Sequence, residues 1–93
     1  MPVGLLTLEL QLPEAQSLKD KRQVLRSLKD RLRGHFNVAV AELDFQDVLN
    51  TSVVGVVTLS NAEQHVEHSL QQVLDEAYKI LGPLLISHDV DIL

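Results

Sequence analysis

The sequence predicts an α+β domain in which two helices cover one face of a four-stranded antiparallel sheet. Three observations support this class: apolar alternation at both ends of the chain, two segments with helical spacing of apolar residues, and two adjoining β-branched segments in the middle. Their order is strand, helix, strand, strand, helix, strand. The 93 residues, 45% of them hydrophobic, fit a single domain over residues 1–93 with one core.

The first strand and the first helix follow from the spacing of leucines. Residues 3–12 alternate, with polar residues on one side and Leu6, Leu8, Leu10 and Leu12 on the other. Pro13 ends this strand. Ser17 is a predicted N-cap with Asp20 three residues later, a variant of the capping box. Leucines then recur at helical spacing until Gly34, so we predict a helix over residues 17–33.

Two strands are predicted in the middle of the chain, "FNVAVAEL" at 36–43 and "SVVGVVTL" at 52–59, because both are rich in β-branched residues. The polar connection "DFQDVLNT" suits a hairpin, so the two strands are expected to be antiparallel neighbours. Strand 52–59 is apolar on both phases. Only one phase can face the helices, and the other leaves apolar surface that is typical of an interface. Two pairs of residues are candidates for this exposed face. One pair is Val54 and Val56, on the same side of the strand as Thr58, and the other is Val53 and Val57, on the opposite side.

The second helix is predicted to begin after Asn61, an N-cap with Gln64 at the reciprocal position, and to stop at Gly82. Its apolar stripe consists of Val66, Leu70, Val73, Leu74, Ala77 and Leu81. Residues 84–93 form the last strand, whose predicted apolar face consists of Leu84, Ile86, Val90 and Ile92, with His88 half-buried on the same phase. Right-handed crossovers then place both helices on one side of the sheet and the first and third strands at its centre, the ferredoxin-like βαββαβ arrangement.

Positive charge is concentrated in "SLKDKRQVLRSLKDRLR", residues 17–33, although the chain as a whole is acidic. This segment contains seven of the eight Lys and Arg residues and has a net charge of +5, whereas the rest of the chain has −10. At about 100° per residue, five of these side chains fall within roughly 80° of arc beside the leucine face: Lys19, Arg22, Arg26, Lys29 and Arg33. They predict a stripe of positive charge about 25 Å long, comparable with several phosphate spacings along a nucleic acid.

Two features favour a partner for this segment over a merely solvated helix face. Cations in the first turns oppose the helix dipole, at a cost of about 0.3–1 kcal/mol each when exposed. Lys21 lies on the apolar arc, so it must reach the helix end or meet an acidic side chain or a bound anion. An intramolecular role also stays open, with competing partners in the acidic residues that follow the second strand: Glu42, Asp44 and Asp47.

We find no catalytic constellation, and no cofactor site is predicted. Without cysteine the chain has no disulfide, thiolate metal site or cysteine nucleophile. The predicted central strands lack the aromatic residues on which an RNA-recognition motif stacks bases. His65 and His68 stand three residues apart near the start of the second helix, and a surface position explains them better than metal binding does. No segment is apolar enough for a membrane span and no signal peptide is recognisable, which favours a cytoplasmic protein without a membrane partner.

Several stretches within residues 17–61 are specific enough to indicate a family: "SLKDKR", "RLR" followed by "FNV", "AELDFQD" and the closing "SN". In these the chain resembles the small bacterial proteins of the family of unknown function 503, also called YlxP-like. The resemblance implies a ferredoxin-like fold, a cytoplasmic location and no established activity, and genes of this family commonly lie among those for translation and ribosome maturation. One departure is "VLN" at 48–50, where family members often place an aromatic residue after "QD".

We therefore predict a non-enzymatic module that binds structured RNA or a ribosomal particle through phosphate contacts, with salt-sensitive and weakly sequence-specific binding. The predicted contact residues are Lys19, Lys21, Arg22, Arg26, Lys29 and Arg33. Two alternatives stay open. One is a module for homo-oligomerisation or protein interaction through the exposed sheet face, without nucleic acid. The other is an enzyme that uses the carboxylates of "AELDFQD" with a metal ion. The identity of the RNA or protein partner, a small ligand and the number of subunits are not predicted.

Overall fold

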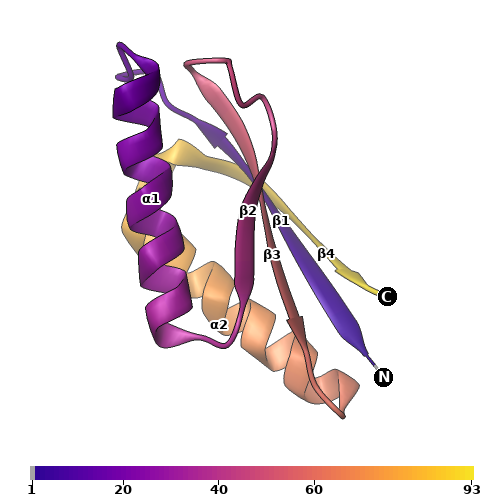
Figure 1. Cartoon of the computed structure of the whole chain (residues 1–93). Coiled ribbons are helices and arrows are strands. Elements are labelled where there is room, and N and C mark those ends of the chain that lie inside the picture. Colours follow the sequence, from indigo (N-terminus) through magenta and orange to yellow (C-terminus); the bar gives the residue numbers. More distant parts are fainter. Residues whose placement is uncertain (1) are drawn as a thin grey trace.

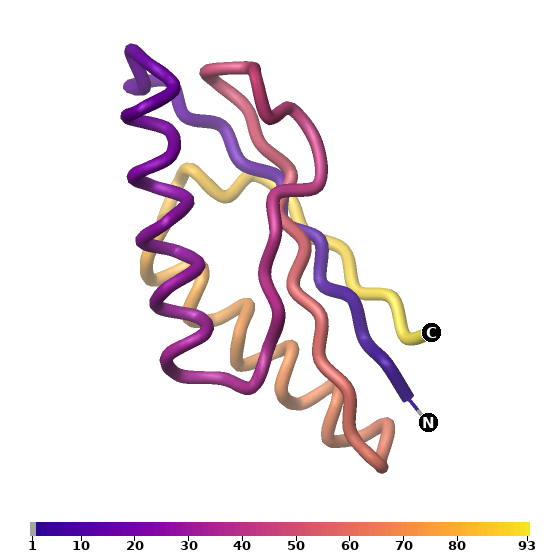
Figure 2. Tube along the Cα trace, in the orientation of Figure 1, coloured from indigo at the N-terminus to yellow at the C-terminus, as the bar shows by residue number. Residues whose placement is uncertain are grey.

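Two layers make up the computed structural model, which describes residues 2–93 (Figure 1). One layer is a sheet of four strands, β1 (Val3–Gln11), β2 (Ala39–Asp44), β3 (Thr51–Leu59) and β4 (Leu85–Ile92). The other contains the helices α1 (Leu18–His35) and α2 (Glu63–Leu81), and a short 3₁₀ helix, η1 (Gly82–Leu84), precedes β4. Both helices lie on the same side of the sheet (Figure 1 and Figure 2), which confirms the predicted ferredoxin-like βαββαβ fold. No helix within residues 2–93 is long and apolar enough to cross a membrane.

The strand order in the sheet is β2-β3-β1-β4, and all neighbouring strands are antiparallel. β1 and β3 are therefore the central strands, as the connection rules predict. Leu6 of β1 lies opposite Val56 of β3, so these two side chains share a face of the sheet. Both are fully buried, and Val54 lies on the same phase. The inner phase of β3 is thus the one that contains Val54 and Val56, while Val53 and Val57 lie on the open face of the sheet.

The core fills the space between the sheet and the two helices. Leu28 and Leu32 of α1 are fully buried in it, together with the inward-facing leucines and valines of β1 and β3 and the apolar stripe of α2. At Gly4, α2 comes especially close to β1, because a methyl group at this position would overlap with the side chains of Val66 and Leu70. The absence of a side chain at this position lets the helix pack directly against the strand backbone.

β4 departs from its predicted pattern because its pairing with β1 shifts by one residue. Leu85 pairs with Leu10, but Ser87 pairs with Glu9, which leaves Ile86 as the extra residue of a bulge. Leu85 is consequently buried, whereas Ile86 is 50% exposed. The alternation of inward-facing and outward-facing residues, on which the prediction for this strand depends, is interrupted at such a bulge.

The predicted apolar face of β4 is therefore right only in part. Val90 and Ile92 lie opposite Leu6 and Gly4 of β1, on the helix-facing side of the sheet, whereas Ile86 falls in the bulge, and the predicted half-buried position of His88 is wrong. Val90 is 45% exposed and His88 is exposed, because β4 is an edge strand at the margin of the helical layer. The His88 ring packs edge-on against Tyr78 of α2, with 6.3 Å between ring centroids. Within the strand, Leu85 at its start belongs to the core and Ile92 near its end packs against it.

α2 begins one residue later than predicted, and the assignment of Asn61 as its N-cap is wrong. Ala62 has an extended backbone, and its carbonyl accepts the first helical hydrogen bonds, from the N–H groups of His65 and Val66. No side chain caps this end. Asn61 lies outside the helix, and its Oδ1 accepts a hydrogen bond from the Ser60 hydroxyl instead.

Candidate nucleic-acid interface

α1 presents its charged side to solvent because its apolar side is fixed against the sheet. The buried residues of the predicted leucine face are Leu25, Leu28 and Leu32. The helix starts at the predicted N-cap, where the Ser17 hydroxyl accepts a hydrogen bond from the Asp20 N–H (3.1 Å). The Asp20 carboxylate in turn accepts from the Gln16 N–H (3.1 Å). These contacts set where the helix begins, and the packing of its leucine face sets its rotation and so places its cations.

Five of the predicted contact residues lie along the outer side of α1 and are called the cationic stripe: Lys19, Arg22, Arg26, Lys29 and Arg33. All are exposed except Lys29, which is half-buried. Within residues 2–93, no member of the stripe lies within ion-pair distance of a carboxylate. Arg33 Nη2 donates to the Val40 carbonyl (3.3 Å), which ties its guanidinium to β2. The stripe thus keeps its positive charge uncompensated by close carboxylates in the described part of the chain.

Lys21 does not belong to this surface. Its side chain is 1% exposed, and its Nζ lies 2.9 Å from Glu42 Oε2. The same ammonium group donates to the backbone carbonyls of Phe45 (2.5 Å) and Val48 (2.6 Å). An ammonium has three N–H donors, so all three are used inside the protein. The prediction of Lys21 as a nucleic-acid contact is corrected accordingly: the side chain on the apolar arc meets an acidic partner, Glu42.

The Lys21 ammonium also fixes the connection between β2 and β3, which lies beside the start of α1 (Figure 2). Phe45 has a φ of 65°, in the left-handed region, where a residue with a Cβ loses roughly 1–2 kcal/mol. The Val48 N–H donates back to the Phe45 carbonyl (3.0 Å) and closes a tight turn. In this conformation both carbonyls face the ammonium and both side chains are partly exposed. The sequence placed Lys21 on the apolar arc but contained no signal for these carbonyl partners.

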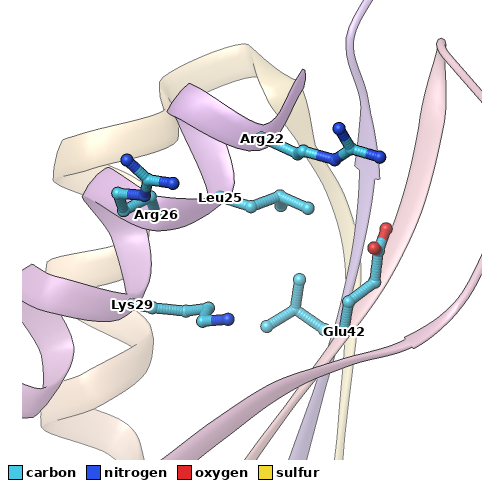
Figure 3. A pocket seen from close by; sticks show the side chains of 6 residues that line it. Arg22, Leu25, Arg26, Lys29 and Glu42 are labelled. Carbon is cyan, nitrogen blue, oxygen red and sulfur yellow. The ribbon is translucent and has the colours of Figure 1, made fainter. Parts of the chain in front are cut away.

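A pocket of ≈200 Å³ lies between α1 and the β2–β3 hairpin, in the middle of the cationic stripe (Figure 3). Its floor consists of the apolar side chains of Leu25 and Val54, which are 6% and 1% exposed. Arg22 and Lys29 extend from the helix toward the strand that contains Glu42 (Figure 3). The lining residues are Arg22, Leu25, Arg26, Lys29, Glu42 and Val54. The sequence predicted the cations of this site but not the pocket, since the pocket depends on how far α1 stands from β2.

Glu42 is the one carboxylate that lines the pocket, and its two oxygens have different surroundings. Oε2 accepts a hydrogen bond from the Ser52 hydroxyl (2.6 Å) and pairs with Lys21. Oε1 makes neither contact, and the side chain is 17% exposed. One oxygen is thus held by the protein, while no hydrogen bond within residues 2–93 engages the other. The site combines three cations, an apolar floor and one acceptor.

The other carboxylates of "AELDFQD" do not gather around Glu42. Asp44 Oδ1 accepts from the Phe45 N–H (2.8 Å), and Asp47 is exposed. His65 and His68 are exposed at the start of α2. Among residues 2–93, no three or more His, Cys, Asp or Glu side chains come together in a way that would hold a metal ion.

The open face of the sheet, opposite the helices, is apolar at its centre. Val53 and Val57 are half-buried there, and Leu43 and Leu59 are 50% and 57% exposed. Leu43 folds over Gly55, where a methyl group would come within 2.7 Å of its Cδ1. An uncovered apolar face of this kind is typical of an interface, as predicted for the outer phase of β3.

Comparison with known proteins identifies relatives by sequence. A family model described as "Protein of unknown function (DUF503)" matches residues 3–81. The chain is also 33% identical over 72 residues to the "Uncharacterized protein YlxP" of Bacillus subtilis (strain 168), a match that covers 77% of this chain and 78% of that protein. These matches confirm the family resemblance of the sequence.

Two solved structures share the architecture at low sequence identity. The structure of Rv0793 from Mycobacterium tuberculosis has a TM-score of 0.59 at 15% identity, covering 100% of this chain and 93% of that one. A de novo designed protein with a ferredoxin fold has a TM-score of 0.51 at 8% identity, covering 100% of this chain and 83% of the designed one. At such identities the likeness concerns the fold alone.

Proposed function

We propose that this chain, which belongs to the DUF503 family of proteins of unknown function, is a non-enzymatic module that binds structured RNA, free or in a ribosomal particle, through the cationic stripe of α1. The observation that carries the proposal is the stripe itself. Its five cations lie on one side of one helix and have no carboxylate partner within residues 2–93, although the chain outside residues 17–33 has a net charge of −10.

The energetics of α1 support a role for these charges beyond solubility. Lys19 stands in the first turn, where an exposed cation opposes the helix dipole by about 0.3–1 kcal/mol, and Arg22 follows in the second turn, where the effect is weaker. Lys21, in the same turns, is offset by Glu42 and two carbonyls, whereas Lys19 and Arg22 have no such compensation in the described chain. Over 18 residues, at ~1.5 Å per residue, α1 is about 27 Å long and spans several phosphates of an RNA backbone.

The direct test is a titration of labelled ribosomal RNA fragments by fluorescence anisotropy. Arg22→Gln/Arg26→Gln removes two charges from the stripe and keeps most of each side chain's packing. Arg31→Gln/Lys79→Gln removes the same charge from positions outside the stripe and is the matched control. We expect saturable binding that the first variant weakens at least tenfold and the control changes by less than threefold. Equal losses in both variants, or no binding at tens of micromolar protein, would overturn the proposal.

A second candidate function is self-association through the open face of the sheet. The half-buried Val53 and Val57 and the exposed Leu43 and Leu59 support it, because a second copy of the chain would cover apolar area that water otherwise contacts. Val57→Glu places a charge at the centre of this face and should convert a dimer to a monomer in light scattering. A wild-type chain that remains a strict monomer at high concentration would exclude this candidate.

A further inference from the structure

The pocket in the cationic stripe has a composition that suits one part of an RNA molecule in particular. We propose that it accepts a single unpaired nucleotide, with the phosphate against the cations, the base over Leu25 and Val54, and a base N–H donating to Glu42 Oε1. This inference rests on the proposed function, because the same cations bind the phosphate. Beyond the proposed function, the inference specifies the partner as RNA with unpaired nucleotides and not a continuous duplex.

A bare phosphate does not account for the pocket as well as a nucleotide does. Glu42 faces the same space as the three cations, and its carboxylate would repel an anion that came close. Its free oxygen can instead accept from a hydrogen-bond donor, which a nucleobase supplies and the phosphodiester of an RNA chain does not. The apolar floor formed by Leu25 and Val54 likewise favours a planar ring over a hydrated ion.

The size of the pocket is comparable with that of a single base. Its ≈200 Å³ is roughly six to seven times the share of a water molecule in the liquid, which suffices for one planar ring system. In a duplex, the donors of a base are used by its partner and its faces are covered by neighbouring bases. Sequence-specific RNA recognition accordingly targets loops, bulges and ends.

Glu42 is also fixed in advance for this role. Lys21 and the Ser52 hydroxyl hold Oε2 from inside the protein, so the carboxylate cannot rotate freely when a ligand arrives. Preorganised groups lose less conformational entropy on binding than flexible ones. An acceptor held in place favours the base with neighbouring donors on its Watson–Crick edge. Guanine offers N1–H and the 2-amino group there, whereas uracil places a carbonyl on each side of its single N–H.

The experiment compares RNAs that share a stem and differ in their loop. Fluorescence anisotropy is measured with a perfect duplex and with hairpins whose uridine loop contains one G, A, C or U at the same position. We expect the hairpins to bind at least tenfold more tightly than the duplex of equal phosphate number, and the G-containing loop to bind most tightly. This comparison uses the wild-type chain and does not depend on the folding of any variant.

Glu42→Gln then tests the acceptor. The glutamine oxygen can still accept from Lys21 and Ser52, while its amide N–H₂ presents donors to the pocket in place of Oε1. The preference for G over A is expected to fall at least fivefold, with the salt dependence unchanged because the cations remain. Asp47→Asn, which removes one negative charge from the same hairpin outside the pocket, is the matched control and should leave the preference intact.

The outcomes separate this inference from the function on which it rests. Equal, salt-dependent binding of duplex and hairpins would overturn the unpaired-nucleotide site and leave the cationic stripe as a phosphate-binding surface. An unchanged base preference in Glu42→Gln would remove Glu42 from base recognition. If neither duplex nor hairpin binds, the proposed function itself fails.

Discussion

Neighbouring cations on the inner and outer sides of α1 differ in burial and in hydrogen bonding. Lys21 is 1% exposed, and its ammonium group contacts Glu42 and two backbone carbonyls. The next residue, Arg22, is exposed and has no carboxylate within ion-pair distance in the described chain. The rotation of the helix therefore decides whether a cation stabilises the fold or is available to a partner. The four predictions below test this contrast, from the largest expected effect to the smallest.

Replacing the inner cation should have the largest effect on stability. Lys21→Met fills a similar volume but leaves the Glu42 carboxylate and two turn carbonyls without their donor, and removing one member of a buried pair typically costs 3–5 kcal/mol. We expect a loss of about 3 kcal/mol, or roughly 10–20 °C in the unfolding midpoint of a domain of this size. Circular dichroism during thermal and urea unfolding measures it.

The matched control for this prediction is Arg22→Met, which changes the adjacent residue on the outer side. A surface substitution of this kind should alter the free energy of unfolding by no more than about 0.5 kcal/mol. If Lys21→Met were as stable as Arg22→Met, the three contacts of the Lys21 ammonium would make no net contribution to the free energy of unfolding. The contrast between the two sides of α1 would then be lost.

The outer cations should instead determine how RNA binding responds to salt. If four of them contact phosphates, the affinity should fall on the order of 10²-fold between about 50 and 200 mM salt. Arg22→Gln/Arg26→Gln should reduce the slope of log Kd against log salt by roughly half. Anisotropy titrations at four salt concentrations measure the slope, and a slope that is the same in wild type and variant would place the contact elsewhere.

The two helix starts provide a smaller contrast. Ser17→Ala removes the hydroxyl that caps α1 and should destabilise the protein by about 1 kcal/mol. Asn61→Ala should change stability by less than about 0.5 kcal/mol, because α2 begins at Ala62 without a side-chain cap. Urea unfolding of both variants tests the pair, and equal losses would contradict the assignment of Ala62 as the N-cap.

The smallest effect is expected at Arg31, which pairs with Glu76 of α2 at 3.4 Å while its own side chain is 58% exposed. Exposed ion pairs contribute about 0–1 kcal/mol. Arg31→Gln should therefore lower the unfolding free energy by no more than about 0.5 kcal/mol, as measured by urea unfolding. A loss above about 1.5 kcal/mol would show that an exposed cation of α1 can also stabilise the fold.

Local patterns were sufficient to predict the fold. The alternation of Leu6, Leu8 and Leu10, the Ser17 cap and the two helical stripes depend on residues close in sequence, so their signals were readable. Apart from the N-cap assigned to Asn61, which was a local signal, the errors arose where a distant segment decides the outcome. The phase of Leu85 and Ile86 at the start of β4 depends on a bulge opposite β1, and the exposure of His88 depends on how far the helical layer extends over the edge strand.

The candidate site was predictable only in part, for the same reason. The helical spacing located the cationic stripe, and the phase of Lys21 already indicated that this lysine needed a partner. The partner carbonyls of Phe45 and Val48 are more than twenty residues away in sequence and carry no side-chain signal. The pocket beside Glu42 depends on the distance between α1 and the hairpin, which no local pattern encodes.

The burial of Lys21 gives the protein an internal reporter of its own opening. The chain has four lysines, and Lys19, Lys29 and Lys79 are at least partly accessible to an amine-reactive reagent. Lys21 can react only when the β2–β3 turn releases its ammonium, so its labelling rate follows the frequency of that release. Mass spectrometry of a labelling time course would thus resolve this local motion from global unfolding. An RNA that restrains the hairpin would slow the modification of Lys21 without touching it.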